Sequence, residues 1–435
     1  MQLMQGGFYM PSYSALSPRQ REQELLVLND RYRDYEKQNF NLNMTRGKPC
    51  PEQLDLSAEL MTCLSKNDYK ALDGTDCRNY GGIGGLPEAR RLFADILGTS
   101  VEHVTVFGNS SLNLMYDILV KALLFPLPGA ISPWSKQGEL KFICPTPGYD
   151  RHFFVTQTLG FEMIPVPMTD EGPDMNQVES LVASDPAIKG LWLVPIYSNP
   201  QGITCSERTC ERLASMPAAA PDFRIFWDNA YVVHHLDPND AESLPDMIEL
   251  CDRAGNPDRI FEFTSTSKIT WAGAGIACMA GSLANLAFVH KHMAIQTIGP
   301  DKVNQLRHCR FLKDRAGVEA LMAKHAKILR PKFDLVHQIL EKEIADTGVC
   351  HWKKPKGGYF ISLSAYPGTA KEVVRMAKAC GVELTPAGNP FPLGLDPDDS
   401  NIRLAPSFPP LDELRPAINV LGTCIKIAAL KKMRG

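Results

Sequence analysis

The chain has 435 residues, of which 44% are hydrophobic and 22% are charged, and its formal net charge is −3. These values are ordinary for a globular protein of roughly two to four domains, and they argue against a disordered, fibrous or membrane protein. The near-neutral charge offers no general electrostatic attraction for nucleic acid or an anionic membrane, and no run of about 18 apolar residues predicts a transmembrane helix.

The 12 cysteines are scattered along the chain, without a CxxC pair or a zinc-like spacing to histidine. They are therefore expected to be small buried side chains in a reducing compartment, and no metal site is predicted. The segment Met1 to Tyr13 lacks the basic region and apolar run of a signal peptide, and its first dozen residues are expected to be poorly ordered. These features predict a cytoplasmic protein.

The N-terminal half of the chain predicts alternating helices and strands. A helical pattern begins after Ser17-Pro18, an extended segment covers Asn39 to Pro51, and a further helix is expected at 56–64. Helices are then expected at 86–97 and 112–124, and short apolar strands at 104–107, 140–144, 161–166, 190–195, 224–227 and 259–263. Such alternation predicts an α/β fold with a mainly parallel sheet covered by helices on both faces.

After about Gly299 the pattern changes to a smaller α+β arrangement. A long charged helix is expected over 302–340, strands at 359–363 and 401–404, and helices at 370–380 and 411–430. We therefore predict a large domain over residues 70–320 and a small domain formed by residues 1–69 and 321–435.

A lysine follows small hydroxyl residues at the end of one predicted strand, in the run from Phe263 to Lys268. The hydroxyl groups are suited to binding phosphate, and the amine is suited to forming an imine with an aldehyde. Taken alone the signal is weak, because most lysines are solvated surface charges.

Two further strand ends carry an aspartate and an asparagine. Asp228 ends a predicted apolar strand, with Tyr231 three residues later, and a carboxylate at this edge of a sheet could hold a protonated ring nitrogen. The competing interpretation is that Asp228 caps the next helix. Asn199 precedes Pro200 after another strand, so its amide projects from a rigid turn, although such turns are common.

A fourth strand end carries Gly108-Asn109-Ser110-Ser111 before a predicted helix. Free backbone N–H groups and hydroxyls at a helix N-terminus bind phosphate, while a simple helix cap is the competing interpretation. The four motifs together are much less expected by chance than any one of them.

The four motifs follow one another in an order that resembles that of the fold-type I pyridoxal-phosphate aminotransferases of class I/II. This order is Gly-Asn-Ser-Ser, Asn-Pro-x-Gly, Asp-x-x-Tyr and Ser-x-Ser-Lys. The resemblance runs from about Asn41 to Leu421 and includes the segment from Tyr80 to Leu92 and the strand Asn401-Ile402-Arg403. Within this family, the sequences of segments 43–49, 147–153 and 272–275 resemble most the aspartate aminotransferases that are related to the aminotransferase domain of MocR-type regulators.

The resemblance implies the following residue roles. Lys268 would hold pyridoxal 5′-phosphate as an imine and move the proton, Asp228 would pair with the pyridinium nitrogen, and Tyr231 and Asn199 would hydrogen-bond the phenolic oxygen. Tyr149 would stack on the ring.

The resemblance also implies the contacts to phosphate and substrate. Tyr80 would reach a phosphate across a homodimer interface. Arg403 would bind the substrate α-carboxylate as a bidentate fork, with Asn199 beside it. The residues implied to hold the phosphate are Gly108, Asn109, Ser110, Ser111, Ser265 and Ser267.

Two positive charges that the resemblance implies are not assigned to a residue: one that pairs with the cofactor phosphate, and one that binds the second carboxylate of the substrate. Many members carry an arginine after the imine lysine that pairs with the phosphate, whereas residues 269–276 contain no basic residue. The second carboxylate of a dicarboxylic substrate needs a cation, and the segment Arg46-Gly47-Lys48 could supply it through either basic residue. The competing interpretation is that both are surface charges flanking a turn.

The resemblance implies an aspartate aminotransferase that exchanges an amino group between L-aspartate and 2-oxoglutarate by a ping-pong mechanism through pyridoxamine phosphate. The alternatives are transamination of another amino acid, a β-lyase reaction, or a non-catalytic regulator that senses an amino acid. Only about 40 residues precede Asn41, too few for a winged-helix domain with its linker, and they carry no marked basic excess, so no nucleic-acid partner is expected. No membrane partner is expected either, because the chain lacks a long apolar run.

Overall fold

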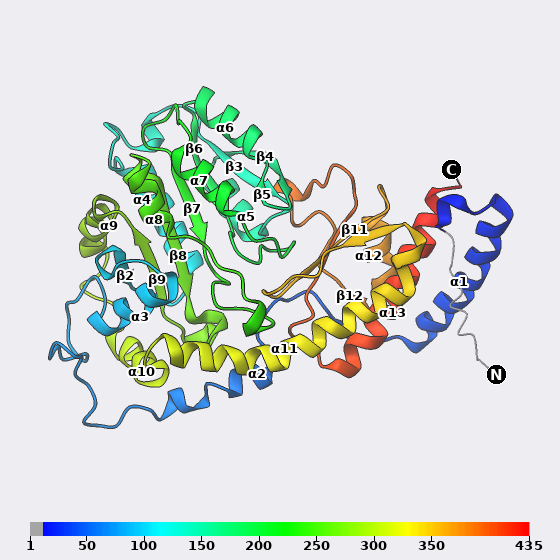
Figure 1. Ribbon diagram of the computed structural model, residues 1–435, viewed down its shortest axis with the longest axis horizontal. Coiled ribbons are helices and arrows are strands. Elements are labelled where there is room, and N and C mark those ends of the chain that lie inside the picture. Colours follow the sequence, from blue (N-terminus) through cyan, green and yellow to red (C-terminus); the bar gives the residue numbers. More distant parts are fainter. Residues whose placement is uncertain (1–11, 435) are drawn as a thin grey trace. The chain divides into compact units, whose positions relative to one another are not determined.

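The computed structural model describes residues 12–434, and the chain divides into two compact units (Figure 1). The larger unit comprises Pro49–Ile328 and Pro355–Gly358, and the smaller comprises 12–48, 329–354 and 359–434. Residues 49–69 and 321–328 thus pack with the larger unit, although the sequence-based boundaries assign them to the small domain. The residues expected to be poorly ordered lie almost wholly outside the described range.

The larger unit is built on an eight-stranded sheet of order β2-β9-β8-β7-β6-β3-β4-β5. Parallel pairing joins β8, β7, β6, β3 and β4, whereas β9 is antiparallel to both β8 and β2. The predicted α/β fold with a mainly parallel sheet is confirmed. The strands are β2 (Val104–Val106), β3 (Lys141–Thr146), β4 (Glu162–Thr169), β5 (Gly172–Pro173), β6 (Ile188–Leu193), β7 (Arg224–Asp228), β8 (Ile260–Ser265) and β9 (Ala277–Gly281).

Two hydrophobic clusters cover the two faces of this sheet, because successive strand residues point to opposite sides. On β7, Ile225 and Trp227 belong to one cluster and Phe226 to the other. The first cluster includes residues of α3, α6, α7, α8, α10 and α11, and the second includes residues of α4, α5 and α9. The helices of this unit are α2 (Pro51–Asp55), α3 (Pro87–Leu97), α4 (Ser111–Leu124), α5 (Asp150–Thr158), α6 (Met175–Ser184), α7 (Glu207–Ser215), α8 (Met247–Arg253), α9 (Leu283–Gln296), α10 (Lys302–Leu312) and the first half of α11 (Arg315–Ile344).

Two of the helix predictions are wrong. The single helix expected over 302–340 is two helices, because Lys313 has a positive φ of 64° and Asp314 accepts a hydrogen bond from the Gly317 N–H, which caps α11. The helix expected at 56–64 is replaced by the earlier helix α2 and a 3-10 turn at Ala58–Met61. Pro51 stands at the first turn of α2, a position that a proline favours.

The smaller unit joins both ends of the chain. Tyr32 of α1 donates a hydrogen bond to the Met376 carbonyl of α12, and Arg31 pairs with Glu343 at 2.9 Å. Strand β1 pairs in parallel with β12, and β10, β11 and β13 form an antiparallel sheet. The elements are α1 (Pro18–Gln38), β1 (Leu42–Asn43), β10 (Cys350–Trp352), β11 (Ile361–Ala365), α12 (Ala370–Ala379), β12 (Val382–Glu383), β13 (Asn401–Leu404) and α13 (Leu411–Lys432).

All 12 cysteines are free thiols, and all but the partly exposed Cys63 are buried, as their scattered spacing predicts. Among residues 12–434, no helix combines the length and the apolar character that a bilayer span requires.

Candidate active site

The predicted motifs of the larger unit follow strand ends that share one edge of the sheet. Because β9 is antiparallel to both β2 and β8, strand β2 runs in the same direction as β8, β7, β6 and β3. The carboxyl ends of these five strands therefore lie at the same edge, where open α/β sheets bind ligands. The motifs that follow them contain Asn109, Lys268, Asp228, Asn199 and Tyr149.

Asp228, the last residue of β7, is held by a histidine. Its Oδ2 atom lies 2.9 Å from Nε2 of His152, and the two side chains are 3% and 2% exposed. Since an ionised carboxylate only accepts hydrogen bonds, Nε2 of His152 is the donor. The other carboxylate oxygen, Oδ1, is buried and has no hydrogen-bond partner among the described residues. Asp228 is thus engaged in the interior rather than capping a helix, and it retains one free acceptor.

His152 is itself fixed by aromatic rings. It stacks on Trp192 of β6 with centroids 4.4 Å apart and an interplanar angle of 9°, and the ring of Tyr149 meets it edge-on at 4.9 Å. Tyr149 is the N-cap of α5, so His152 lies on the same helix face three residues later. His152 lies within the segment 147–153 that resembles the family, and no role is predicted for it from the sequence. Its position three residues after Tyr149 on one predicted helix was the feature of the sequence that could have indicated their contact.

Asn199 lies in the turn after β6 and is 4% exposed. The turn is closed by hydrogen bonds from Ile203 N–H to the Ser198 side-chain hydroxyl at 3.1 Å and from Gly202 N–H to the Ser198 carbonyl at 2.6 Å. Asn199 lines a small cavity together with Tyr149, His152 and Trp192. The structure therefore brings this predicted residue next to the group that holds Asp228.

Lys268 ends a single 3-10 turn, Thr266–Lys268, that follows β8. Its Nζ atom lies 4.8 Å from the ring centroid of Tyr231, which is buried. Burial lowers the pKa of Lys268, and the nearby negative charge of Asp228 opposes this shift. An amine with a lowered pKa is more readily neutral, which a nucleophile or a general base requires.

Two loops meet beside this lysine. A Cβ atom built on Gly275 would lie 3.3 Å from the Asn109 carbonyl oxygen and 3.1 Å from Oγ1 of Thr266. Gly108 has φ of 67°, and Ser110, the N-cap of α4, makes no side-chain capping bond. The Ser265 hydroxyl donates to Oγ of Ser267 at 3.0 Å. Backbone N–H groups at a helix start, such as that of α4, and hydroxyls such as those of both loops are groups suited to binding phosphate.

Ile276 ends the segment 269–276 after Lys268, which contains no basic residue. Its N–H donates to Oγ1 of Thr266 at 3.0 Å, its carbonyl accepts from the Thr266 N–H at 2.9 Å, and its side chain is 1% exposed. The position is thus part of the packed connection between β8 and β9, and it supplies no positive charge.

Two of the predicted substrate residues of the smaller unit, Arg403 and Gly47, contact one phenyl ring. Arg403 lies on β13 and is 8% exposed, with its guanidinium carbon 5.0 Å from the Phe360 ring centroid. Its Nη2 atom lies 3.5 Å from Oγ1 of Thr385, which donates to the Thr45 carbonyl at 3.2 Å. A Cβ atom built on Gly47 would lie 2.1 Å from Cζ of Phe360. Gly47 and Arg403 therefore contact the same ring, although 356 sequence positions separate them.

The two basic residues beside Gly47 are both exposed. The Lys48 ammonium lies 4.2 Å from the Phe408 ring centroid, and the Lys48 N–H donates to the Arg46 carbonyl at 3.0 Å. Tyr80, in the larger unit, is 79% exposed.

Comparison with known proteins agrees with this geometry. Residues 16–435 match the family described as aspartate amino-transferase. An aspartate aminotransferase of Corynebacterium glutamicum is 49% identical over 399 residues, which cover 92% of each chain. The solved structure of an aspartate transaminase from the same species is 46% identical, with a TM-score of 0.95 over 97% of this chain and 99% of that chain.

A more distant solved structure shares the fold. The α-aminoadipate aminotransferase LysN from Thermus thermophilus, complexed with N-(5′-phosphopyridoxyl)-L-leucine, is 20% identical with a TM-score of 0.71 over 97% of both chains. The chain belongs to the aspartate amino-transferase family. It is an aminotransferase of fold type I, and pyridoxal phosphate is the cofactor of this family.

Proposed function

We propose that this protein exchanges an amino group between L-aspartate and 2-oxoglutarate with pyridoxal 5′-phosphate as its cofactor. The observation that carries the cofactor assignment is the buried Oδ1 atom of Asp228, which has no hydrogen-bond partner among the described residues. A protonated pyridine nitrogen would satisfy it. The aspartate preference rests on the 49% identical relative of that name and on the two basic residues that flank Gly47.

The residues of the larger unit fit this cofactor. Asp228 would hold the pyridinium nitrogen and keep it protonated, while the hydrogen bond from His152 fixes the carboxylate. Tyr231 and Asn199 would hydrogen-bond the phenolic oxygen, and Tyr149 would cover one ring face. The phosphate would be held by Gly108, Asn109, Ser110, Ser111, Ser265 and Ser267, with Tyr80 of a second subunit.

Bound pyridoxal phosphate supplies an electron sink that acidifies the Cα–H of an attached amino acid. Lys268 would provide the amine that holds the cofactor and, once released, would act as the base that moves the proton between Cα of the substrate and C4′ of the cofactor. Its pKa is lowered by burial, so the neutral amine needed for this step is more available than that of a solvated lysine.

The smaller unit provides the substrate contacts in this proposal. Arg403 would bind the α-carboxylate as a two-pronged donor, a geometry to which a guanidinium is suited. Phe360 and Thr385 hold its side chain in place. Lys48 or Arg46 would bind the second carboxylate of a dicarboxylic substrate. We further propose that the protein acts in the cytoplasm as a homodimer with shared active sites.

The test is the visible absorbance of the purified protein loaded with pyridoxal phosphate. L-Aspartate is expected to bleach the band, and 2-oxoglutarate is expected to restore it. L-Tyrosine and cystathionine serve as controls for other substrates, and bleaching by one of them instead of aspartate would exclude the proposed donor. Lys268→Ala is expected to lose the band of the bound cofactor, and its persistence would show that Lys268 does not hold it.

A further inference from the structure

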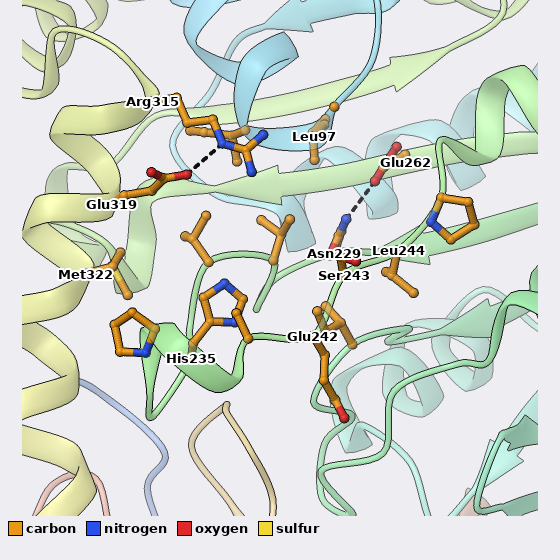
Figure 2. A pocket seen from close by; sticks show the side chains of 18 of the residues that line it. Leu97, Asn229, His235, Glu242, Ser243, Leu244, Glu262, Arg315, Glu319 and Met322 are labelled. Atoms are coloured by element: carbon orange, nitrogen blue, oxygen red, sulfur yellow. Dashed lines mark hydrogen bonds and ion pairs between the residues drawn. The ribbon is translucent and has the colours of Figure 1, made fainter.

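A cavity of about 390 Å³ lies within the larger unit and is separate from the residues assigned to catalysis (Figure 2). Its walls come from the loop after β7, the C-terminal end of α3, strand β8 and the first half of α11. Apolar side chains form much of the lining, among them Leu97, Val233, Leu244 and Met322. Its volume falls in the range of small-molecule sites, which are roughly 300–1,000 Å³.

A buried polar pair, Asn229 and Glu262, lines this cavity. The two residues are 3% and 4% exposed, and Nδ2–H of Asn229 donates to Oε1 of Glu262 at 2.8 Å (Figure 2). The Oδ1 atom of Asn229 is buried and has no hydrogen-bond partner among residues 12–434. A buried acceptor without a donor costs free energy, so a ligand that donates a hydrogen bond here would be stabilised.

The ionisable groups that line the cavity are mainly acidic. They are Glu242, Glu262 and Glu319, with Arg315 and His235 as the basic groups. Arg315 already pairs with Glu319 at 2.8 Å and donates to the Asp95 carbonyl at 2.8 Å, so Glu262 has no cation beside it. Burial lowers the pKa of His235, which favours the neutral ring, and its Nδ1 atom lies 2.7 Å from the Tyr197 hydroxyl.

Burial raises the pKa of Glu262 to about 8, and the negative charge of Asp246 adds to the shift. The other titratable groups around it are Cys278 of β9, Glu242 and His235 of the loop, and Arg315 and Glu319 of α11. At neutral pH the carboxyl is therefore largely protonated, and it would ionise if a cation were placed beside it.

We propose that this cavity binds a small organic cation that carries N–H donors on an apolar body, with the cationic end at Oδ1 of Asn229 and the carboxylate of Glu262. The apolar wall accommodates the body of such a ligand. A carboxylate ligand would instead meet the carboxylates of Glu242 and Glu319, and a neutral ligand would not stabilise the ionised form of Glu262. The proposal is independent of the amino-acid specificity of the active site.

The probe is n-butylguanidinium, which does not condense with the cofactor aldehyde, and its neutral counterpart is n-butylurea. Isothermal titration calorimetry on the holoenzyme is expected to give at least about tenfold tighter binding for the cation, because hydrogen bonds to charged groups are the stronger ones. Titration in buffers of different ionisation enthalpy is expected to show release of close to one proton at pH 7 and much less at pH 9. Equal affinity of the two probes would overturn the proposal.

Three variants locate the site. Glu262→Gln is expected to lose the preference for the cation and the proton release, while the exposed Glu211→Gln is the matched control and retains both. Ala323→Leu fills part of the cavity and is expected to weaken both probes, which keeps the test decisive if Glu262→Gln does not fold. Unchanged binding in Glu262→Gln or in Ala323→Leu would place the cation elsewhere and overturn the assignment.

Discussion

Nε2 of His152 donates a hydrogen bond to Oδ2 of Asp228 over 2.9 Å, and neither side chain is more than 3% exposed. The stacked ring of Trp192 and the edge of Tyr149 fix the imidazole in turn. The carboxylate therefore has a defined orientation before any ligand is bound, and its second oxygen remains available.

Removing this imidazole is expected to slow the reaction. In His152→Ala, Asp228 loses a charge-assisted hydrogen bond worth about 1.5–3 kcal/mol, so kcat is expected to fall about tenfold to a hundredfold. The visible spectrum of the bound cofactor is expected to change as well, which a merely structural loss would not produce in folded protein. His351→Ala, at an exposed strand position, is the control, and an equal effect in both variants would contradict the role of His152.

Gly47 is expected to be required for the packing of Arg403. An alanine Cβ at this position would lie 2.1 Å from Cζ of Phe360, the ring that also contacts the Arg403 guanidinium. Gly47→Ala is therefore expected to lower the free energy of unfolding by about 1–3 kcal/mol and to raise KM for amino acids. Thermal unfolding and steady-state kinetics measure both. Gly273→Ala, where a Cβ would meet nothing within 4 Å, is the control and should be near neutral.

Steady-state kinetics can tell whether Arg46 or Lys48 binds the second carboxylate of the substrate. If Lys48 binds the second carboxylate, Lys48→Ala is expected to raise KM for aspartate by about tenfold or more, through loss of a charge-assisted hydrogen bond, with little effect on alanine. Arg46→Ala is the matched variant and would show the same selective effect if it carries this role instead. Equal changes for aspartate and alanine in both variants would exclude the segment from recognition of the second carboxylate.

Glu262 is expected to make stability fall as the pH rises from its ordinary pKa of about 4.5 towards its folded value of about 8. Its folded pKa of about 8 lies above the ordinary glutamate value, so the folded protein binds more protons than the unfolded chain between these values. The free energy of unfolding therefore decreases by up to about 1.4 kcal/mol per pH unit over this range from this residue. Urea unfolding at pH 6.5 and 8 should show a steeper loss in the wild type than in Glu262→Gln. Identical pH dependence would contradict the raised pKa.

Tyr80, 79% exposed in the described chain, is expected to complete the site of a second subunit. Mixing inactive Lys268→Ala protein with impaired Tyr80→Phe protein is expected to restore activity, because a hybrid dimer contains one site with both residues intact. Each variant alone, refolded under the same conditions, is the control. If hybrid dimers form and no activity returns, the two residues do not belong to shared sites.

The sequence by itself determined the larger features of this protein. Apolar strands alternating with helices predicted the mainly parallel sheet, because burial on both faces demands uninterrupted apolar residues. The order of the polar motifs at the strand ends indicated the family. Asn401 to Leu404 is a strand with the expected bounds, since its β-branched and apolar residues are bounded by turn-forming ones.

The tertiary structure alone decided which side chains complete one another. The pairing of His152 with Asp228, the shared contact of Gly47 and Arg403 with Phe360, and the burial of Glu262 beside Asn229 each join residues distant in the chain. Local periodicity carries no information about such contacts, because they depend on which strands are neighbours and on how side chains pack between them. The same holds for the pKa of Glu262, which is set by the burial that the fold imposes.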